Sequence, residues 1–284
     1  MHSNSGELLN GPNAAQIELW NGRVGKKWAA LQVSLDRMLA HATAELKARA
    51  GSVRGLRVLD IGCGTGETCA IWLEGGAEVT GVDVSAPMLA VAASRTAGRA
   101  TLLEADASLW MGDAPFDLAV SQSGLMFFAD PDAAFANIAA NIRPGGRLLF
   151  TCWRAAAENQ WVTTPLGSIR DLLPESPPPV PHAPGPFALA DGKRLQGILA
   201  RAGFADVAIE PFDFPVRLAS EGGVEPAVRL AMQVGPSGSA LAEASDEVRA
   251  AAAVRLRTAL APHQHDGCVT LGGAMWVVDA VRPD

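Results

Sequence analysis

The stretch Val58–Gly66, which reads VLDIGCGTG, decides the fold of this 284-residue chain. A short apolar run opens directly into three glycines at positions 62, 64 and 66. An apolar run that feeds a glycine-rich turn is typical of a buried parallel strand in an α/β sheet. Glycines at such a turn let the backbone approach a ligand where side chains would block it. The stretch therefore predicts an α/β fold with a ligand at the carboxyl end of this strand.

The spacing of the turn disfavours a dinucleotide-binding oxidoreductase. The dinucleotide fingerprint needs its third glycine three residues after the second, and position 67 is Glu. Asp60 lies just before the turn, where a carboxylate would repel a pyrophosphate but suits a ligand that carries an ammonium group. The turn thus favours a different nucleoside-type ligand.

Outward from this turn, short apolar runs alternate with helical segments, as in a parallel sheet built from βαβ units. Strands are expected at 57–61, 78–84, 101–105, 116–121, 147–152, 207–214 and 274–281, and helices at 67–73, 85–96, 132–142 and 191–202. Residues 14–50 are predicted to form one helix, because Trp28, Leu31, Leu35, Met38 and Ala42 recur at helical spacing. Residues 225–261 are expected to be mostly helical, with an interruption at 235–239.

Two further acids follow the next strands. Asp83 ends the second expected strand, where a carboxylate can accept hydrogen bonds from both hydroxyls of a ribose. Asp106 ends the third, where it can accept from an exocyclic amine of adenine. Three acids at consecutive strand ends, together with the glycine turn, predict one ligand site along that edge.

Composition narrows the class of protein. The net charge is −7, and the chain lacks a long basic run, which argues against a nucleic-acid partner. Four scattered cysteines predict no disulfide framework, no metal site and a reducing, cytoplasmic location. The polar start of the chain predicts no signal peptide, and no apolar stretch is long enough to predict a membrane span.

As a set, several motifs resemble the class I S-adenosylmethionine-dependent methyltransferases, in particular the ubiquinone and menaquinone biosynthesis group. The matching segments are VLDIGCGTG (58–66), GVDVSAPML (81–89), EADA (104–107), FDLAVSQSGLMFFADP (116–131) and NIRPGGRLLFTCWR (141–154). The resemblance implies a Rossmann-like, doubly wound sheet of seven strands in the order 3-2-1-4-5-7-6, with an antiparallel last strand and a helical cap. It covers roughly residues 55–154, so it does not carry over substrate specificity.

The resemblance also implies roles for single residues. Asp60 and Gly62 would face the methionine part of the cofactor, Asp83 the ribose, and Asp106 with the backbone of Ala107 the adenine edge. The other expected cofactor contacts are Trp28, Cys63, Gly64, Gly66, Val84, Met88 and Ser121, with Cys63 as a small packing residue. The expected substrate pocket consists of aromatic side chains: Trp20, Phe127, Phe128, Trp153 and Trp161.

The chain is expected to divide into four parts: an N-terminal helical lid (1–50), a cofactor-binding core (51–154), a Pro-rich cap segment (155–190), and a completion of the core (191–284) with a helical insertion at about 216–266. The proline cluster at 174–186 is either a linker or a lid segment beside the active site. The sequence does not identify a general base. His182, His263 and His265 are the candidates if the acceptor is a hydroxyl.

The resulting hypothesis is methyl transfer from S-adenosylmethionine to a small-molecule acceptor, natural-product-like or quinone-like. A methyltransferase that acts on RNA or protein is the first alternative, and a non-catalytic cofactor-binding protein is the second. The acceptor and the methylated atom (O, N, C or S) are left open, and a homodimer is compatible with the sequence.

Overall fold

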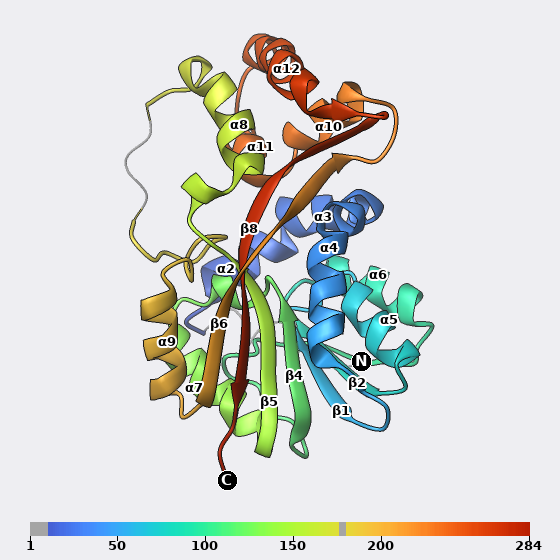
Figure 1. The fold of residues 1–284 in the computed structure, drawn as a ribbon, viewed down its shortest axis with the longest axis vertical. Helices are drawn as coiled ribbons and strands as arrows, with labels where there is room; N and C mark the ends of the chain where they lie inside the picture. The colour runs from blue at the N-terminus through green and yellow to red at the C-terminus, as the bar shows by residue number, and fades with distance from the viewer. Residues whose placement is uncertain (1–10, 176–179) are drawn as a thin grey trace.

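The computed structural model describes residues 11–175 and 180–284. Its base is one mixed sheet in the order β3-β2-β1-β4-β5-β8-β6 (Figure 1). The strands are β1 (Arg57–Ile61), β2 (Glu78–Asp83), β3 (Thr101–Glu104), β4 (Phe116–Gln122), β5 (Ile142–Trp153), β6 (Ala205–Ala219) and β8 (Cys268–Val281). The first five pair in parallel, and β8 lies antiparallel between β5 and β6. The predicted strand order and the antiparallel last strand are confirmed.

The sheet has eight strands rather than the seven predicted, because a two-residue strand, β7 (Gln264–His265), pairs with the start of β8. β6 and β8 are also longer than predicted. β5 pairs with β8 only as far as Trp153 and Met275, but β6 and β8 continue together to the pair Ala219–Val269. The apolar residues of this two-stranded extension are buried under helices rather than within the sheet. The sequence pattern within 207–214 therefore did not predict the extension.

Helices cover both faces of the sheet, because neighbouring residues of each strand point to opposite sides. Val58 and Leu149 belong to a core that includes α4 (Gln32–Ala50) and α5 (Glu67–Glu74). Leu59 and Leu148 belong to the opposite core, which includes α7 (Pro131–Asn141) and α9 (Gly192–Arg201). α6 (Ala86–Thr96) packs beside β3 and α5. Each central strand is thus buried on both faces, which fixes its register.

The N-terminal segment forms three helices rather than one: α2 (Ala14–Asn21), α3 (Arg23–Ala30) and α4. The first break lies at Gly22, and the side chain of Asn21 beside it turns toward the sheet. Its amide donates to the carbonyl of Val84 at 2.6 Å, and its oxygen accepts from the N–H of Ala86 at 3.0 Å. The prediction of a single helix was wrong because the tertiary contact at the end of β2 bends the chain. Residues 1–10 of the expected lid lie outside the described residues.

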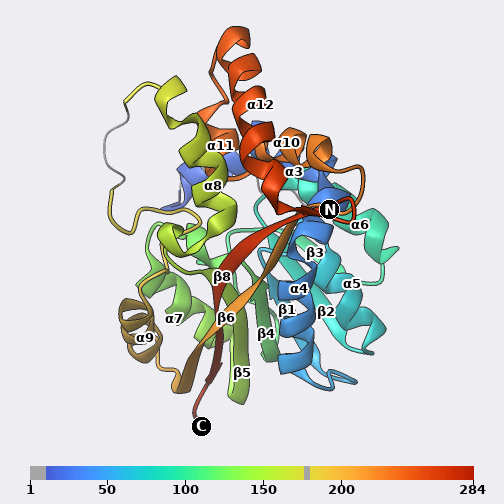
Figure 2. The same ribbon diagram turned by 45° about the horizontal axis from the view of Figure 1, so that its top comes forward.

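A helical cap stands on the two-stranded extension, as Figures 1 and 2 show. It contains α8 (Gln160–Ile169), α10 (Val224–Ala231), α11 (Gly235–Ala240) and α12 (Asp246–Leu260), and short 3-10 turns lie at Leu125–Phe127, Ala156–Glu158, Arg170–Leu172 and Ala261–His263. Of the range 216–266 where a helical insertion was predicted, residues 224–260 contain the three helices α10, α11 and α12, whereas 216–219 belong to β6 and 264–265 to β7. Among the described residues, no helix combines the length and the apolar character needed to cross a membrane.

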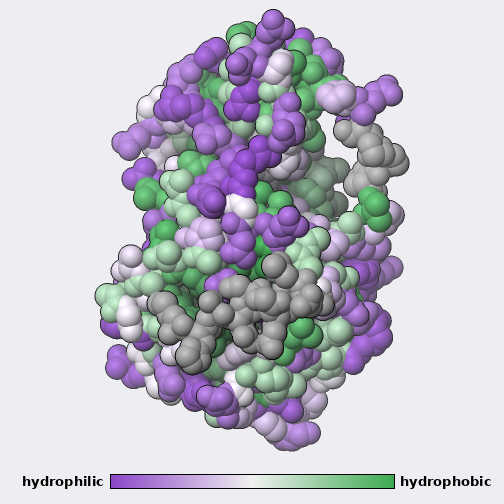
Figure 3. All heavy atoms as spheres, turned by 180° about the vertical axis from the view of Figure 1, so that it is seen from behind, coloured by the Kyte–Doolittle hydropathy of each residue, from purple (hydrophilic) through white to green (hydrophobic). Residues whose placement is uncertain are grey.

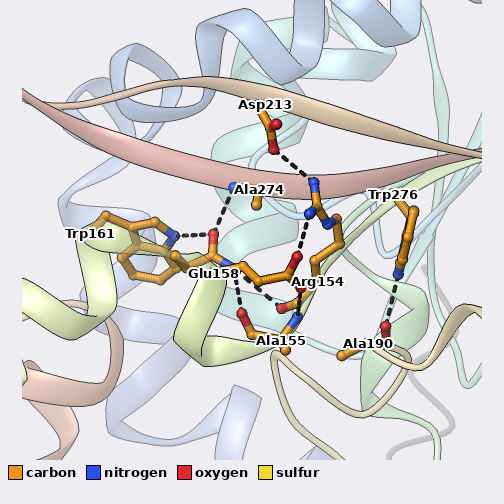
Figure 4. A network of polar contacts seen from close by, with 9 residues as sticks. Arg154, Ala155, Glu158, Trp161, Ala190, Asp213, Ala274 and Trp276 are labelled. Carbon is orange, nitrogen blue, oxygen red and sulfur yellow. Dashed lines mark hydrogen bonds and ion pairs between the residues drawn. The ribbon is translucent and has the colours of Figure 1, made fainter.

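A polar network joins the cap to the sheet where β5 ends (Figure 4). Asn159 is fully buried, and its side-chain oxygen accepts from the Trp161 indole N–H at 3.1 Å and from the N–H of Ala274 at 2.8 Å. Arg154 forms an ion pair with Asp213 of β6 at 2.7 Å and another with Glu158. The network therefore fixes the start of α8, and with it the ring of Trp161.

Candidate active site

A cavity lies over the carboxyl ends of β1, β2 and β4, between the sheet, the N-terminal helices and the cap. One side of its wall consists of the glycine turn and the strand-end residues, and the other consists largely of apolar and aromatic side chains. In Figure 3, hydrophobic surface shows between the lower and upper parts of the molecule on the face opposite to that of Figure 1. The site is thus placed where open α/β sheets bind ligands.

The glycine turn lies very close to the loop after β4. A Cβ atom added at Gly62 would lie 2.9 Å from the Cα of Gly124, and one added at Gly124 would lie 2.7 Å from the carbonyl oxygen of Ile61. Gly62 also has a φ of +64°, which disfavours other residues. The two loops can meet only because both positions lack a side chain, and together they form a backbone-lined floor for the cavity.

Asp83 is held by backbone donors at the end of β2. Its carboxylate accepts from the N–H of Gly64 and from the N–H of Ser85, each at 2.8 Å. Burial raises the pKa of Asp83, and these backbone hydrogen bonds oppose the rise. Each carboxylate oxygen has a further lone pair available. Asp83 is therefore an oriented acceptor in the cavity wall.

Asp60 is buried beneath the turn, with 1% of its surface exposed. Its Oδ2 accepts from the Sγ of Cys69 at 3.3 Å, whereas its Oδ1 has no partner among the described residues. Burial raises the pKa of Asp60 to about 6, although hydrogen bonds from Thr68 and Cys69 counteract it. An unpaired buried carboxylate oxygen is costly unless a ligand supplies a donor or a cation.

Asp106 is joined to the N-terminal segment. The side-chain amide of Asn13 donates to both of its carboxylate oxygens, at 3.0 and 2.9 Å, and also to the Oγ of Ser108. The Asn13 oxygen in turn accepts from the N–H of Ala129 at 2.7 Å. Asn13 is buried and therefore anchors the start of α2 to the ends of β3 and β4.

Aromatic rings form the opposite side of the cavity in two groups. The Trp20 ring makes edge contacts with Trp28 at 5.5 Å and with Phe127 at 5.1 Å between centroids. Trp153 packs against Trp161 at 4.8 Å. The first group comes from the N-terminal helices and the loop after β4, and the second from the end of β5 and α8. These rings exclude water and present π faces that can attract a cation.

Most of the predicted site residues lie in this cavity wall. Those that do are Trp20, Trp28, Gly62, Cys63, Gly64, Asp83, Val84, Met88, Asp106, Ala107, Phe127, Phe128, Trp153 and Trp161. Asp60, Gly66 and Ser121 lie behind it: the Ser121 hydroxyl donates to the carbonyl of Ile61 at 2.7 Å, and Gly66 packs against Ala92 of α6. Of the Pro-rich segment, Pro186 reaches the wall, while residues 176–179 lie outside the described part.

The three histidines considered as bases lie elsewhere. His263 is in a 3-10 turn after α12, His265 is in β7 at the far end of the two-stranded extension, and His182 is exposed in the loop before α9. None of them lines the cavity as described. The extension carries residues 263–265 away from the sheet edge, and this could not be anticipated from the expected strand lengths.

Sequence reasoning missed a polar group in the wall built around Glu67. Burial and the carboxylate of Asp36 raise the pKa of Glu67 to about 7, and Arg95, which pairs with Asp36, opposes the rise. The hydroxyl of Thr43 lies 3.4 Å from Glu67 and donates to Gln122 at 2.9 Å. A carboxyl group with this pKa can hold or accept a proton near neutral pH. The helical stripe of 14–50 indicated packing, and no motif pointed to Asp36 or Thr43.

Comparison with known proteins finds a family match within the central part of the chain. Residues 59–150 match the family described as "Methyltransferase domain". A malonyl-[acyl-carrier protein] O-methyltransferase of Pseudescherichia vulneris is 39% identical over 37% of this chain and 42% of its own length. The O-methyltransferase rstn1 of Aspergillus nomiae is 37% identical over 42% of this chain and 54% of its own length. The chain therefore spans about half or less of the length of these relatives.

Solved structures share the fold over most of the chain. The magnesium protoporphyrin IX methyltransferase of Synechocystis PCC 6803 with bound SAH aligns over 96% of this chain and 100% of its own, with a TM-score of 0.54 and 15% identity. The [4+2]-cyclase SpnF aligns over 92% of this chain and 96% of its own, with a TM-score of 0.53 and 21% identity. Because a cyclase shares this architecture, the fold alone does not specify the reaction. Residues 59–150 thus match a methyltransferase-domain family, and the sheet order is that of the Rossmann-like methyltransferase fold.

Proposed function

We propose that the chain is an S-adenosylmethionine-dependent methyltransferase that acts on a small-molecule acceptor. The observation that carries the proposal is that Asp83 and Asp106 line one cavity whose opposite wall is aromatic, with Asp60 buried directly behind the glycine turn of that cavity. The carboxylates provide acceptors for an ammonium group, for ribose hydroxyls and for an adenine edge. The aromatic wall provides a water-poor place for an acceptor.

The residues present fit this cofactor. The unpaired Oδ1 of Asp60 calls for a cationic or hydrogen-donating partner, and Asp83 presents oriented lone pairs for two hydroxyls. Val84 and Met88 give an apolar surface for a purine, next to Asp106 and Ala107. When bound, S-adenosylmethionine supplies an electrophilic methyl group on a sulfonium centre.

The chain contributes position and a dry environment rather than a reactive group of its own. Charge on the sulfonium disappears during transfer, so a wall of Trp20, Trp28 and Phe127 favours the reaction by excluding water. The relatives named above as O-methyltransferases support oxygen as the methylated atom. The net charge of −7 and the enclosed aromatic wall favour a small acceptor over a nucleic acid.

Two measurements test the proposal. Calorimetry should detect micromolar binding of S-adenosylmethionine and S-adenosylhomocysteine and none of NADH; the reverse result would reject it. Mass spectrometry of reactions with a panel of phenols, quinols and carboxylic acids should then reveal products heavier by one methyl group. Methylation of RNA or protein with none in the panel would reject the small-molecule part alone.

A further inference from the structure

A second cleft lies between α3 and the cap, beside the cavity described above. Its lining contains four cationic side chains and no carboxylate: Arg23 and Lys27 of α3, Arg229 of α10 and Arg249 of α12, with Met232, Gln233, Gly238 and Ala242. Four cations around one cleft contrast with the net charge of −7 of the chain. Elements from distant parts of the sequence thus gather positive charge at one place.

These charges are only partly neutralised by the described residues. Arg23 pairs with exposed Glu243 at 2.9 Å, and Lys27, Arg229 and Arg249 have no carboxylate within ion-pair distance in the described part of the chain. Burial lowers the pKa of Lys27, and the charges of Arg23 and Arg249 lower it further. The cations therefore repel one another across the cleft, and a bound anion would relieve that repulsion.

Three of the four cationic side chains donate hydrogen bonds to backbone carbonyls, which partly accounts for their positions. The Nζ of Lys27 donates to the carbonyl of Gln233 at 3.2 Å, and an Nη1 of Arg249 donates to that of Leu241 at 2.8 Å. Arg23 contacts the carbonyl of Ala242 at 3.4 Å. These carbonyls follow α10 and α11, where cations are favourable. Arg229 makes no such side-chain contact among the described residues, so capping does not account for it, and each of the other cations keeps unused donors.

We infer that this cleft binds a phosphate or phosphomonoester dianion. A tetrahedral dianion can accept from several guanidinium and ammonium groups at once, which are the donors present here. Lys27 lines the cleft while its neighbour Trp28 lines the cavity. In the same way, Gln233 lines the cleft and the next residue, Val234, lines the cavity. The two spaces are therefore neighbours, and the inference extends to an elongated acceptor that places a phosphate in the cleft and its other end in the aromatic cavity. That last step rests on the proposed function, whereas the anion site does not.

Thermal unfolding of the full chain tests the anion site without any assay of methyl transfer. Inorganic phosphate should raise Tm more than sodium chloride at equal ionic strength, with saturation. Phenyl phosphate should bind more tightly than inorganic phosphate if its ring enters the aromatic cavity. Equal affinity of the two would keep the anion site and overturn the link to the acceptor. Absence of any phosphate-specific shift would overturn the site itself.

Arg229→Gln is the decisive variant, because the Arg229 side chain makes no hydrogen bond or ion pair among the described residues and its charge acts only on exposed Glu225. It should leave Tm in chloride unchanged and weaken phosphate binding about fivefold, with a larger loss in the double variant with Arg249→Gln. Lys47→Gln removes an equal charge from an exposed position on α4 and should change nothing. If Arg229→Gln binds phosphate with unaltered affinity and binds S-adenosylhomocysteine normally, the anion site is refuted and the proposed cofactor site is unaffected.

Discussion

The two sides of the cavity are built in different ways. The side with the glycine turn, Asp83 and Asp106 comes from one stretch of chain. Backbone N–H groups hold Asp83, and Asp106 accepts from the N–H of Ser108 and from the side chain of Asn13. The aromatic side combines α2 and α3 with the ends of β4 and β5 and with the cap, and ring contacts hold it. We infer from this difference that the rigid sheet edge suits recognition of a constant cofactor, whereas the aromatic side, which is built from distant segments, suits a variable acceptor.

Removal of a strand-end carboxylate should give the largest effect and should fall on cofactor affinity. Asp83→Ala should weaken S-adenosylhomocysteine binding by about 2–3 kcal/mol, because buried ribose hydroxyls and the N–H groups of Gly64 and Ser85 would lose their acceptor. Calorimetry measures the loss, and exposed Asp113→Ala is the matched control. An affinity within twofold of the unaltered chain would remove the ribose role from Asp83.

Glu67 lies in the cavity wall and should make stability depend on pH. Its pKa is raised from 4.5 to about 7, so the folded chain holds this proton more tightly than the unfolded chain does. Its contribution therefore makes the unfolding free energy fall as pH rises between these values. Glu67→Gln should raise the unfolding free energy by about 1–2 kcal/mol at pH 8 and by less at pH 5. Urea titrations at both pH values would contradict this if the two differences were equal.

Asp60 should make cofactor affinity depend on pH on the sheet side of the cavity. Its pKa is about 6, and the carboxylate form is the one that attracts an ammonium group. S-adenosylhomocysteine affinity should therefore fall about tenfold from pH 7 to pH 5. Asp60→Asn should bind more weakly and lose this component of the pH profile. An unchanged profile in that variant would assign the titration to another group.

The aromatic side should respond in turnover rather than in affinity for cofactor. Trp28→Ala should lower kcat about fivefold by admitting water, at a cost of about 1 kcal/mol, with S-adenosylhomocysteine affinity nearly unchanged. The measurement is turnover per folded molecule beside Tm, with exposed Leu19→Ala on α2 as control. A lower Tm with unchanged turnover would make Trp28 a packing residue and not part of a lid.

The sequence by itself determined the parts whose signals are local. The run VLDIGCGTG, the acids at successive strand ends and the alternating apolar segments predicted an α/β fold with parallel strands and a ligand site at the strand ends, because period and turn chemistry act over a few residues. The strand order came from the resemblance of these motifs to the class I methyltransferases. The antiparallel last strand was likewise implied by that resemblance and was confirmed.

Tertiary structure alone decided how distant segments meet. The break of the first helix at Gly22, the anchoring of Asn13 on Asp106, and the extension of β6 and β8 that carries the histidines away from the cavity all depend on long-range contacts. The raised pKa of Glu67 depends on burial and on Asp36, 31 positions earlier in the sequence. Burial and charge proximity are properties of the packed chain, so the spacing of residues along the sequence does not predict them.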